Sequence, residues 1–309
     1  MEFFQVTMSQ IIIFIIYILV GVYAAKRKIL NQERLDAVSK VIINITFPFM
    51  LFHTTLSETS KNQFMNALPI ILIVMLMYIT LFITVLMLRR MFKLTGETAR
   101  LYQVTTMFGN TGFMGIPIIR CLLPGSGMIY MALYTVADQL IFWTLGMYLL
   151  DPGGGRNLTQ NLKKIINPQT IAIVLAILCV FFGVELPYEL DESFQKIGNI
   201  TTPLAMIYTG GLFCYTDIKG GFRRKEYYGA VLVKMILLPV IFFSILQYIP
   251  FINQDMRILL TVISSMPSMA SVAMIANAKN MDGTYPAAEV FFTTLCSVVT
   301  LPLIILLTL

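Results

Sequence analysis

Apolar runs of about twenty residues recur along the whole chain, and each is long enough to cross a bilayer as an α-helix. Of the 309 residues, 57% are hydrophobic and 12% are charged, whereas about a quarter of the residues in a typical soluble domain are charged. Transmembrane β-barrels show short segments with alternating apolar and polar residues instead. The sequence therefore predicts an all-α polytopic membrane protein.

We predict ten transmembrane helices, most of them joined by short loops. The predicted spans are residues 7–25, 37–56, 66–88, 101–122, 128–150, 168–184, 199–216, 227–249, 256–278 and 285–308. Short cytoplasmic loops carry an excess of lysine and arginine. With the N-terminus outside, seventeen of the 22 lysine and arginine residues fall inside and four fall outside. Both termini are therefore predicted to lie outside.

Two patterns recur in corresponding spans and indicate an internal repeat. Span two contains Asn-Ile-Thr-x-Pro at residues 44–48, and span seven repeats it at residues 199–203. Asp138 in span five and Glu289 in span ten form a second pair. Because each half has five spans, the second copy enters the membrane from the opposite side, as in many secondary transporters. We predict a first repeat at residues 1–150, a Gly-rich linker at 151–167 and a second, inverted repeat at 168–309.

Helix-breaking residues occur near the middle of spans four and nine. Span four contains the segment FGNTGFMGIP at residues 108–117, and span nine contains Pro267. An unsatisfied backbone group in lipid costs several kcal/mol, so such breaks must be buried in protein or face water. We therefore predict that the two breaks cross, shield each other and present helix N-termini to an anion. The candidate substrate-binding residues are Asn110, Thr111, Gly112, Ser265, Pro267 and Ser268, and the candidate crossover or hinge residues are Gly109, Gly115, Pro117, Pro48 and Pro203. Close helix packing is the alternative interpretation of the glycines.

Three ionisable residues lie within predicted spans, where a charge is costly and often functional. Asp138 is a candidate for binding the coupling proton or cation, because burial favours the protonated carboxyl. Glu289 is its repeat-related partner, and Lys234 can pair with either acid or attract an anionic substrate. The alternatives are a structural polar contact for Asp138, a position near the membrane interface for Glu289 and snorkelling for Lys234.

Other polar residues give weaker indications. Asn44, Thr46, Asn199 and Thr201 are polar contacts beside helix kinks, and their contact with substrate is left open. The chain has one histidine and four cysteines without a CxxC spacing, so the sequence predicts no metal site and no cofactor.

The sequence resembles the auxin efflux carrier family, which includes plant auxin exporters and bacterial carriers assigned to malate or malonate. Three segments carry the resemblance, which covers nearly the whole chain: FGNTGFMGIPI in span four, NITFP in span two and TTLCSVVTLPLIILL in span ten. The resemblance implies a fold like that of bile acid:sodium symporters. Spans 1, 2, 6 and 7 then form a scaffold and dimer surface, and spans 3–5 and 8–10 form a mobile transport domain with crossing breaks.

The same resemblance implies roles for individual residues. Asn110 matches the family's asparagine near the substrate carboxylate, Gln139 resembles a polar position of span five that lines the same site, and Pro267 matches the proline of the span-nine break. Plant members carry a long loop between the repeats, where this chain has a short linker.

These observations predict a secondary active transporter of small organic anions that works by alternating access. Monocarboxylates, dicarboxylates such as malate or malonate, and auxin-like weak acids are the expected substrates, and a proton or Na⁺ gradient is the expected energy source. The alternative is a membrane channel or sensor that retains the fold. The sequence has no nucleotide-binding loop and no GxSxG motif, so an enzyme is not expected. The expected location is a bacterial plasma membrane. The expected partners are the bilayer and a second copy bound through the scaffold helices, and nucleic acid is not among them.

Overall fold

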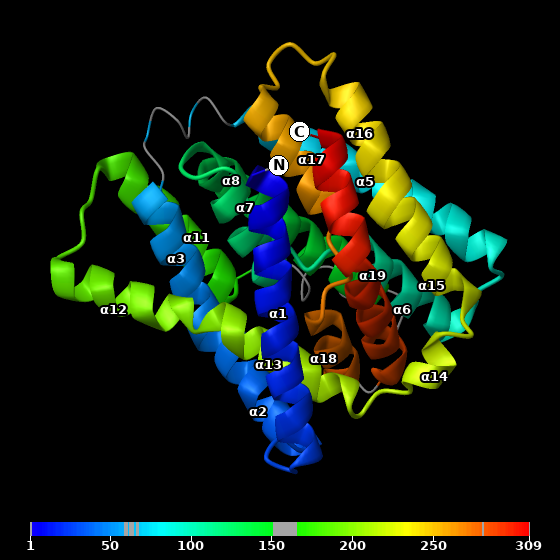
Figure 1. The fold of residues 1–309 in the computed structure, drawn as a ribbon. Helices are drawn as coiled ribbons and strands as arrows, with labels where there is room; N and C mark the ends of the chain where they lie inside the picture. The colour runs from blue at the N-terminus through cyan, green and yellow to red at the C-terminus, as the bar shows by residue number, and fades with distance from the viewer. Residues whose placement is uncertain are drawn as a thin grey trace.

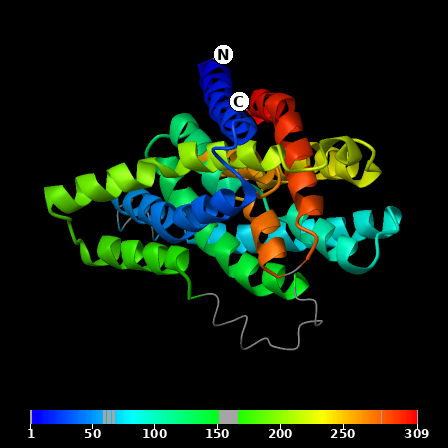
Figure 2. The ribbon, with the colours of Figure 1, turned by 90° about the horizontal axis from the view of Figure 1, so that it is seen from below.

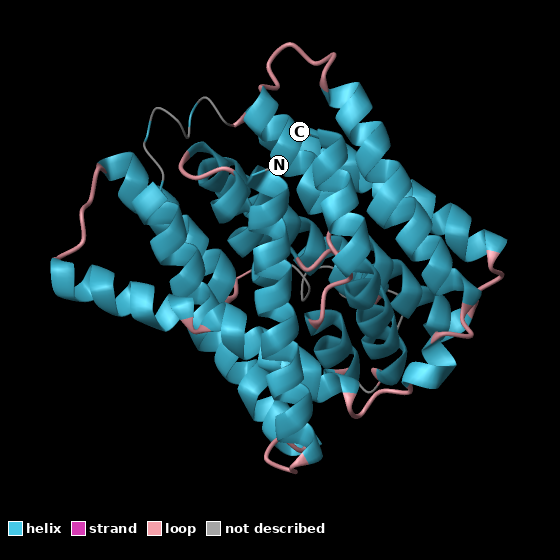
Figure 3. Cartoon of the chain, viewed as in Figure 1, coloured by secondary structure: helices cyan, strands magenta, loops and turns pink. Residues whose placement is uncertain are grey.

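The structure is a computed structural model that describes residues 2–58, 61, 65, 68–150, 166–279 and 281–308. Within these residues every regular element is a helix, as Figure 3 shows. One isolated antiparallel β-bridge, between Gly109 and Ser268, is the exception to this helical structure in the described part. The prediction of an all-α protein is confirmed. Most of the predicted linker, residues 151–165, lies outside the described residues.

The helices of the two halves are as follows. Before residue 151 they are α1 (Glu2–Lys26), α2 (Gln32–Val41), η1 (Ile42–Thr46), α3 (Phe47–Glu58), α5 (Pro69–Met91), α6 (Gly96–Met107), η2 (Thr111–Gly115), α7 (Ile116–Leu122), α8 (Ser126–Ile141), η3 (Phe142–Gly146) and α9 (Met147–Leu149). After residue 165 they are α11 (Pro168–Phe182), α12 (Tyr188–Asn199), α13 (Thr201–Phe213), α14 (Ile218–Gly221), α15 (Lys225–Ala230), η4 (Val231–Leu237), α16 (Leu238–Leu246), α17 (Gln254–Ser264), α18 (Ser271–Ala278) and α19 (Thr284–Thr308). The η segments are π-helices that continue directly into an α-helix.

Six stretches of helix among the described residues are long and apolar enough to cross a membrane. They are Thr7–Lys26, Gln32–Ser57, Pro69–Met91, Gly127–Leu149, Lys225–Leu246 and Thr284–Thr308, which correspond to predicted spans 1, 2, 3, 5, 8 and 10. The shorter apolar helices Thr111–Leu122 and Pro168–Phe182 fall in predicted spans 4 and 6. The chain is therefore an integral membrane protein with several apolar helices. Predicted spans 4 and 9 are divided into shorter helices, and predicted span 7 contains the 13-residue helix α13.

Local sequence signals set several helix ends. The side chains of Asn31, Asn167 and Asn253 each accept a hydrogen bond from the backbone N–H three residues later, which caps α2, α11 and α17. Gly183 ends α11 in the left-handed conformation, with φ 67°. A proline occupies the first turn of α11, where a backbone N–H has no intrahelical acceptor.

One region differs from the sequence prediction. Residues 188–198, which connect predicted spans 6 and 7, belong to helix α12. The segment packs an aromatic side chain against α3: the Phe194 ring lies 4.7 Å from the Phe49 ring and 5.6 Å from the Phe52 ring. This contact between segments about 140 residues apart is absent from local sequence patterns.

Helices from both halves of the chain interleave. Figure 1 shows α1 crossing in front of α13, and the contact is close because of two glycines. A Cβ on Gly210 would lie 2.0 Å from the Ile18 carbonyl oxygen, and one on Gly21 would lie 2.0 Å from the Ile207 carbonyl oxygen. Small residues allow such approach between membrane helices. In Figure 2, α3, α11 and α12 extend to one end of the molecule, and α5, α15 and α16 extend to the other.

Candidate functional site

The first helix break lies between α6 and η2. α6 ends at Met107, and Phe108 is extended, with φ −96° and ψ 127°. Asn110 has φ −78° and ψ 55°, which is also outside the helical range. Helix resumes at Thr111 as η2 and continues through α7. Residues 108–110 therefore interrupt an otherwise helical, buried segment.

The second break lies between α17, which ends at Ser264, and α18, which begins at Ser271. It contains Pro267, which has no N–H to donate and disfavours helix at the residue before it. Met266 and Ser268 on either side of this proline are fully buried. The break is therefore enclosed by protein, as a non-helical segment at membrane depth must be.

The two breaks pair with each other through their backbones. The Asn110 N–H donates to the Pro267 carbonyl over 2.7 Å, and the Met269 N–H donates to the Phe108 carbonyl over 3.1 Å. These bonds flank the bridge between Gly109 and Ser268. The approach is tight, because a Cβ at position 109 would lie 3.2 Å from the Met266 Cβ. Backbone groups freed by one break are thus satisfied by the other.

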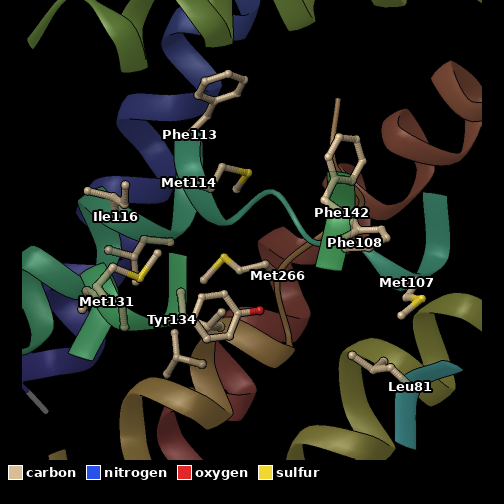
Figure 4. Packing of buried hydrophobic residues seen from close by; sticks show 14 of the residues in the cluster. Leu81, Met107, Phe108, Phe113, Met114, Ile116, Met131, Tyr134, Phe142 and Met266 are labelled. Carbon is tan, nitrogen blue, oxygen red and sulfur yellow. The ribbon is translucent and has the colours of Figure 1, made fainter. Parts of the chain in front are cut away.

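Bulky side chains enclose this crossing, as Figure 4 shows. The Phe108 ring packs edge-on against the Phe142 ring of η3 at 5.0 Å, and the Phe113 ring packs against the Phe47 ring at 5.2 Å. A Cβ on Gly112 would lie 2.6 Å from the end of the Phe47 ring. The start of α3 therefore packs directly on η2, at the exit from the first break.

Glu289 of α19 lies at the crossing and is fully buried. Its Oε1 accepts a hydrogen bond of 2.7 Å from the Thr106 hydroxyl and one of 3.4 Å from the Ser268 hydroxyl. Its other oxygen, Oε2, has no hydrogen-bond partner in the described part of the chain. The Ser268 N–H donates to the Thr293 hydroxyl, one turn further along α19. A single carboxylate thus connects α6, the second break and α19.

Asp138 of α8 forms a separate buried cluster with aromatic residues. It accepts a short hydrogen bond from the Tyr78 hydroxyl of α5 and one of 3.4 Å from the Gln139 amide. Gln139 in turn accepts a bond of 3.1 Å from the Trp143 indole N–H. The Tyr78 ring lies 5.4 Å from the Phe108 ring, so the cluster adjoins the first break.

Lys234 of η4 is 2% exposed, so it does not snorkel to the membrane surface. Its ammonium interacts electrostatically with the carboxylates of both Glu289 and Asp138. Its Nζ has no hydrogen-bond partner among the residues that the structure describes. π-helical turns are frequent at functional sites, and a buried unpaired polar atom requires an explanation.

The structure places most of the predicted substrate-binding residues at the crossing of the two breaks. Asn110 and Thr111 are buried there, whereas Gln139 belongs to the adjoining Asp138 cluster. The Ser265 hydroxyl instead donates to the Val262 carbonyl of its own helix, over 2.7 Å. The predicted hinge residues Gly109, Gly115 and Pro117 lie in or just after the first break, whereas Pro48 and Pro203 lie within the first turns of α3 and α13.

The two threonines of the repeated Asn-Ile-Thr motif differ from its two asparagines in their burial. Thr46 and Thr201 are buried, and their hydroxyls have no hydrogen-bond partner among the described residues. Asn44 and Asn199 are exposed, and the Asn44 amide donates to the Lys40 carbonyl of its own helix. Residues two apart on a helix point to roughly opposite faces, which explains the division.

Sequence reasoning missed several residues of the site. Four of them form hydrogen bonds with the two acids or with the partners of these acids: Thr106, Thr293, Tyr78 and Trp143. The Ser271 hydroxyl at the start of α18 is also buried, without a partner in the described chain. Tyr78 carried a usable signal, because a tyrosine within an apolar span needs a partner for its hydroxyl. The threonines carried none, because a threonine hydroxyl can bond to its own helix. Within the described residues, no three His, Cys, Asp or Glu side chains are grouped as metal ligands would be.

Comparison with known proteins agrees with this architecture. A family model described as "Membrane transport protein" matches residues 6–305. The chain belongs to this family, that of the auxin efflux carriers. It is 24% identical to an uncharacterized transporter of Methanocaldococcus jannaschii over 309 residues, which covers 97% of this chain and 98% of the relative. It is 23% identical to the uncharacterized transporter YfdV of Escherichia coli K12 over 298 residues, covering 94% and 93%. The protein is thus a transmembrane transport protein, and its family is named for transport rather than for catalysis.

Proposed function

We propose that this protein is a secondary active transporter of small organic anions. Mono- and dicarboxylates, including malate, malonate and auxin-like weak acids, are the proposed substrate class. The observation that carries the proposal is the backbone pairing of the two breaks beside three buried polar groups that lack partners in the described chain: Lys234 Nζ, Glu289 Oε2 and the Ser271 hydroxyl.

Helix N-termini at this crossing favour a carboxylate. η2 and α7 form one apolar helix from Thr111, and α18 starts at Ser271 next to the second break. The first N–H groups of a helix have no acceptor within it, and its N-terminus carries a partial positive charge. Two such termini, together with the buried Lys234 ammonium, favour an anion in the protein interior.

The two buried carboxylates support coupling to a proton or Na⁺ gradient. Asp138 and Glu289 lie on α8 and α19, and both interact electrostatically with the Lys234 ammonium. A buried carboxylate is stabilised by taking up a proton or binding a cation. Loading of either acid therefore changes the net charge beside the helix N-termini, which links cation binding to the affinity for an anion.

The proposed mechanism is alternating access between two inverted five-helix repeats. Spans 1, 2, 6 and 7, represented by α1, α2–α3, α11 and α12–α13, form the scaffold and the surface of a homodimer. Spans 3–5 and 8–10 form the transport domain, which contains both breaks, Asp138, Lys234 and Glu289. The protein is proposed to lie in a bacterial plasma membrane with both termini outside, as the distribution of lysine and arginine favours.

Counterflow in proteoliposomes tests this function. Vesicles loaded with an unlabelled organic acid are diluted into a trace of the same labelled acid, with a panel of mono- and dicarboxylates selected by thermal shift. A carrier accumulates label transiently because bound substrate returns with the moving site. Label that merely equilibrates indicates a channel, and absence of flux for every acid that binds indicates a sensor; either result contradicts the proposal. Protein-free vesicles provide the background.

A further inference from the structure

A groove of about 930 Å³ lies between α1, the end of α13 and α19, away from the crossing of the two breaks. Figure 1 shows α1 and α19 close together near the N- and C-termini and diverging toward the end of α1. The groove occupies this wedge. Phe213 and Phe291, whose rings pack edge-on at 4.7 Å, lie at its wall.

Two helix faces form most of the lining. α1 contributes its residues 15, 18, 19, 22 and 26, and α19 contributes residues 291, 294, 295, 298 and 299. These spacings of three and four residues define a single face on each helix. Leu19, Leu295 and Val299 are 59%, 50% and 63% exposed, so the groove opens to the surface of an apolar part of the molecule. In a membrane protein this surface meets lipid.

The groove has a charged end. Lys26, at the end of the α1 face, is exposed and forms no salt bridge with any residue in the described ranges. No aspartate or glutamate lines the groove. The neighbouring Arg27 guanidinium lies 5.5 Å from the centre of the Tyr23 ring, and tyrosine at a helix end marks the level of the lipid headgroups. The basic end of the groove is thus at headgroup depth.

The length of the groove suits an acyl chain. The α1 face from Lys26 to Ile15 spans eleven residues, or roughly 16 Å at 1.5 Å per residue. This is close to the ~15 Å that half of a 30 Å hydrocarbon core measures. A chain entering at the headgroup level can therefore follow the apolar faces to about the middle of the bilayer.

We propose that this groove binds one acyl chain of an anionic phospholipid from the adjacent leaflet, with the lipid phosphate against Lys26. Basic pockets between membrane helices are known to hold acidic headgroups, and the apolar faces of α1 and α19 provide the matching chain site. A neutral lipid fills the same apolar groove but gains nothing from Lys26. Selectivity for the anionic headgroup therefore distinguishes a binding site from general contact with the bilayer.

Tryptophan quenching measures this selectivity without any transport readout. The chain has a single tryptophan, so Trp143→Phe removes the background signal. Leu295→Trp then reports on the groove, and Leu76→Trp on α5 is the matched control, with a parent residue that is 51% exposed. Each reporter is reconstituted in phosphatidylcholine with a low mole fraction of brominated phosphatidylglycerol or brominated phosphatidylcholine. Val299→Trp replaces Leu295→Trp if the latter variant does not purify as a folded protein.

We expect the groove reporter to be quenched roughly fivefold more effectively by brominated phosphatidylglycerol than by the neutral lipid, as one lysine near an anionic headgroup provides. The control reporter should be quenched equally by both. Lys26→Gln should remove the difference, whereas Lys225→Gln, which removes the same charge elsewhere, should preserve it. Equal quenching of the groove reporter by the two lipids would overturn the proposal, and so would equal effects of the two lysine changes. Cross-linking at position 295 that shows a second copy of the chain in the groove would also overturn it.

Discussion

The Thr106 hydroxyl of α6 donates a 2.7 Å hydrogen bond to the Glu289 carboxylate of α19, across 183 positions of sequence. Both residues are fully buried, and Ser268 in the second break bonds to the same oxygen. The bond places an ionisable group directly on the helix that leads into the first break. A change in the charge of Glu289 therefore alters the electrostatic environment of both breaks.

Glu289→Gln should uncouple transport from its driving gradient, because glutamine preserves the shape but cannot take up a proton or balance a cation. We expect counterflow to persist while accumulation driven by a proton or Na⁺ gradient is lost. The matched control is Glu226→Gln, since Glu226 is a buried acid whose carboxylate bonds to Tyr285 and not to a residue of either break. Gradient-driven accumulation at the unmodified level in Glu289→Gln would exclude this residue from coupling.

Asp138→Asn should likewise abolish pH- or ion-driven uptake. Tyr78→Phe tests the contact itself, because it removes the hydroxyl that donates to the Asp138 carboxylate and retains the ring. We expect Tyr78→Phe to shift the pH profile of uptake without abolishing it, since the carboxylate remains but loses a stabilising donor. Driving-force dependence that is unchanged in Asp138→Asn would show that Asp138 makes only a structural contact.

Asn110→Ala should weaken binding of the organic acid roughly 10- to 100-fold, which corresponds to the ~1.5–3 kcal/mol of a hydrogen bond to a charged group. The protein should stay folded, because the bond from position 110 to the Pro267 carbonyl uses the backbone N–H. Equilibrium binding and the melting temperature are measured together. Asn44→Ala, at an exposed asparagine, is the control. Unchanged binding of the organic acid in Asn110→Ala would mean that Asn110 contributes to packing and not to substrate binding.

Lys234→Met should reduce uptake of anions at least tenfold, because the change removes the cation that interacts electrostatically with both carboxylates while retaining an unbranched side chain. Lys225→Met, outside the crossing, removes the same charge and should leave uptake near its normal rate. The two variants are compared by initial rate at matched reconstitution levels. Similar rates for both would indicate that Lys234 neither attracts the substrate nor balances the acids.

Gly112→Ala should destabilise the protein by roughly 1–3 kcal/mol, the usual effect of adding a methyl group to a packed site. The new Cβ would lie 2.6 Å from the end of the Phe47 ring. Phe47→Leu shortens that side chain, so the double variant should recover much of the lost stability. Thermal unfolding of the four proteins in one detergent gives the coupling. Additive effects would show that α3 and η2 are not in contact in the membrane.

The helical membrane fold and the positions of the two helix breaks follow from local features of the amino-acid sequence. Runs of apolar residues set the helices, and the asparagine, glycine and proline residues of the two breaks have local effects on the backbone that act whatever surrounds them. For the same reason the asparagine caps of α2, α11 and α17 can be recognised from a few neighbouring residues.

Which groups face each other depends on how the helices pack in three dimensions. Glu289, near the start of α19, becomes fully buried because α6 and the second break pack over it, and Lys234 interacts electrostatically with two acids from different helices. The pairing of Asn110 with Pro267 spans 157 positions and uses backbone atoms, which every residue type shares. Side-chain patterns report the face of a helix that is apolar, but the partner of that face is selected by packing along the whole chain.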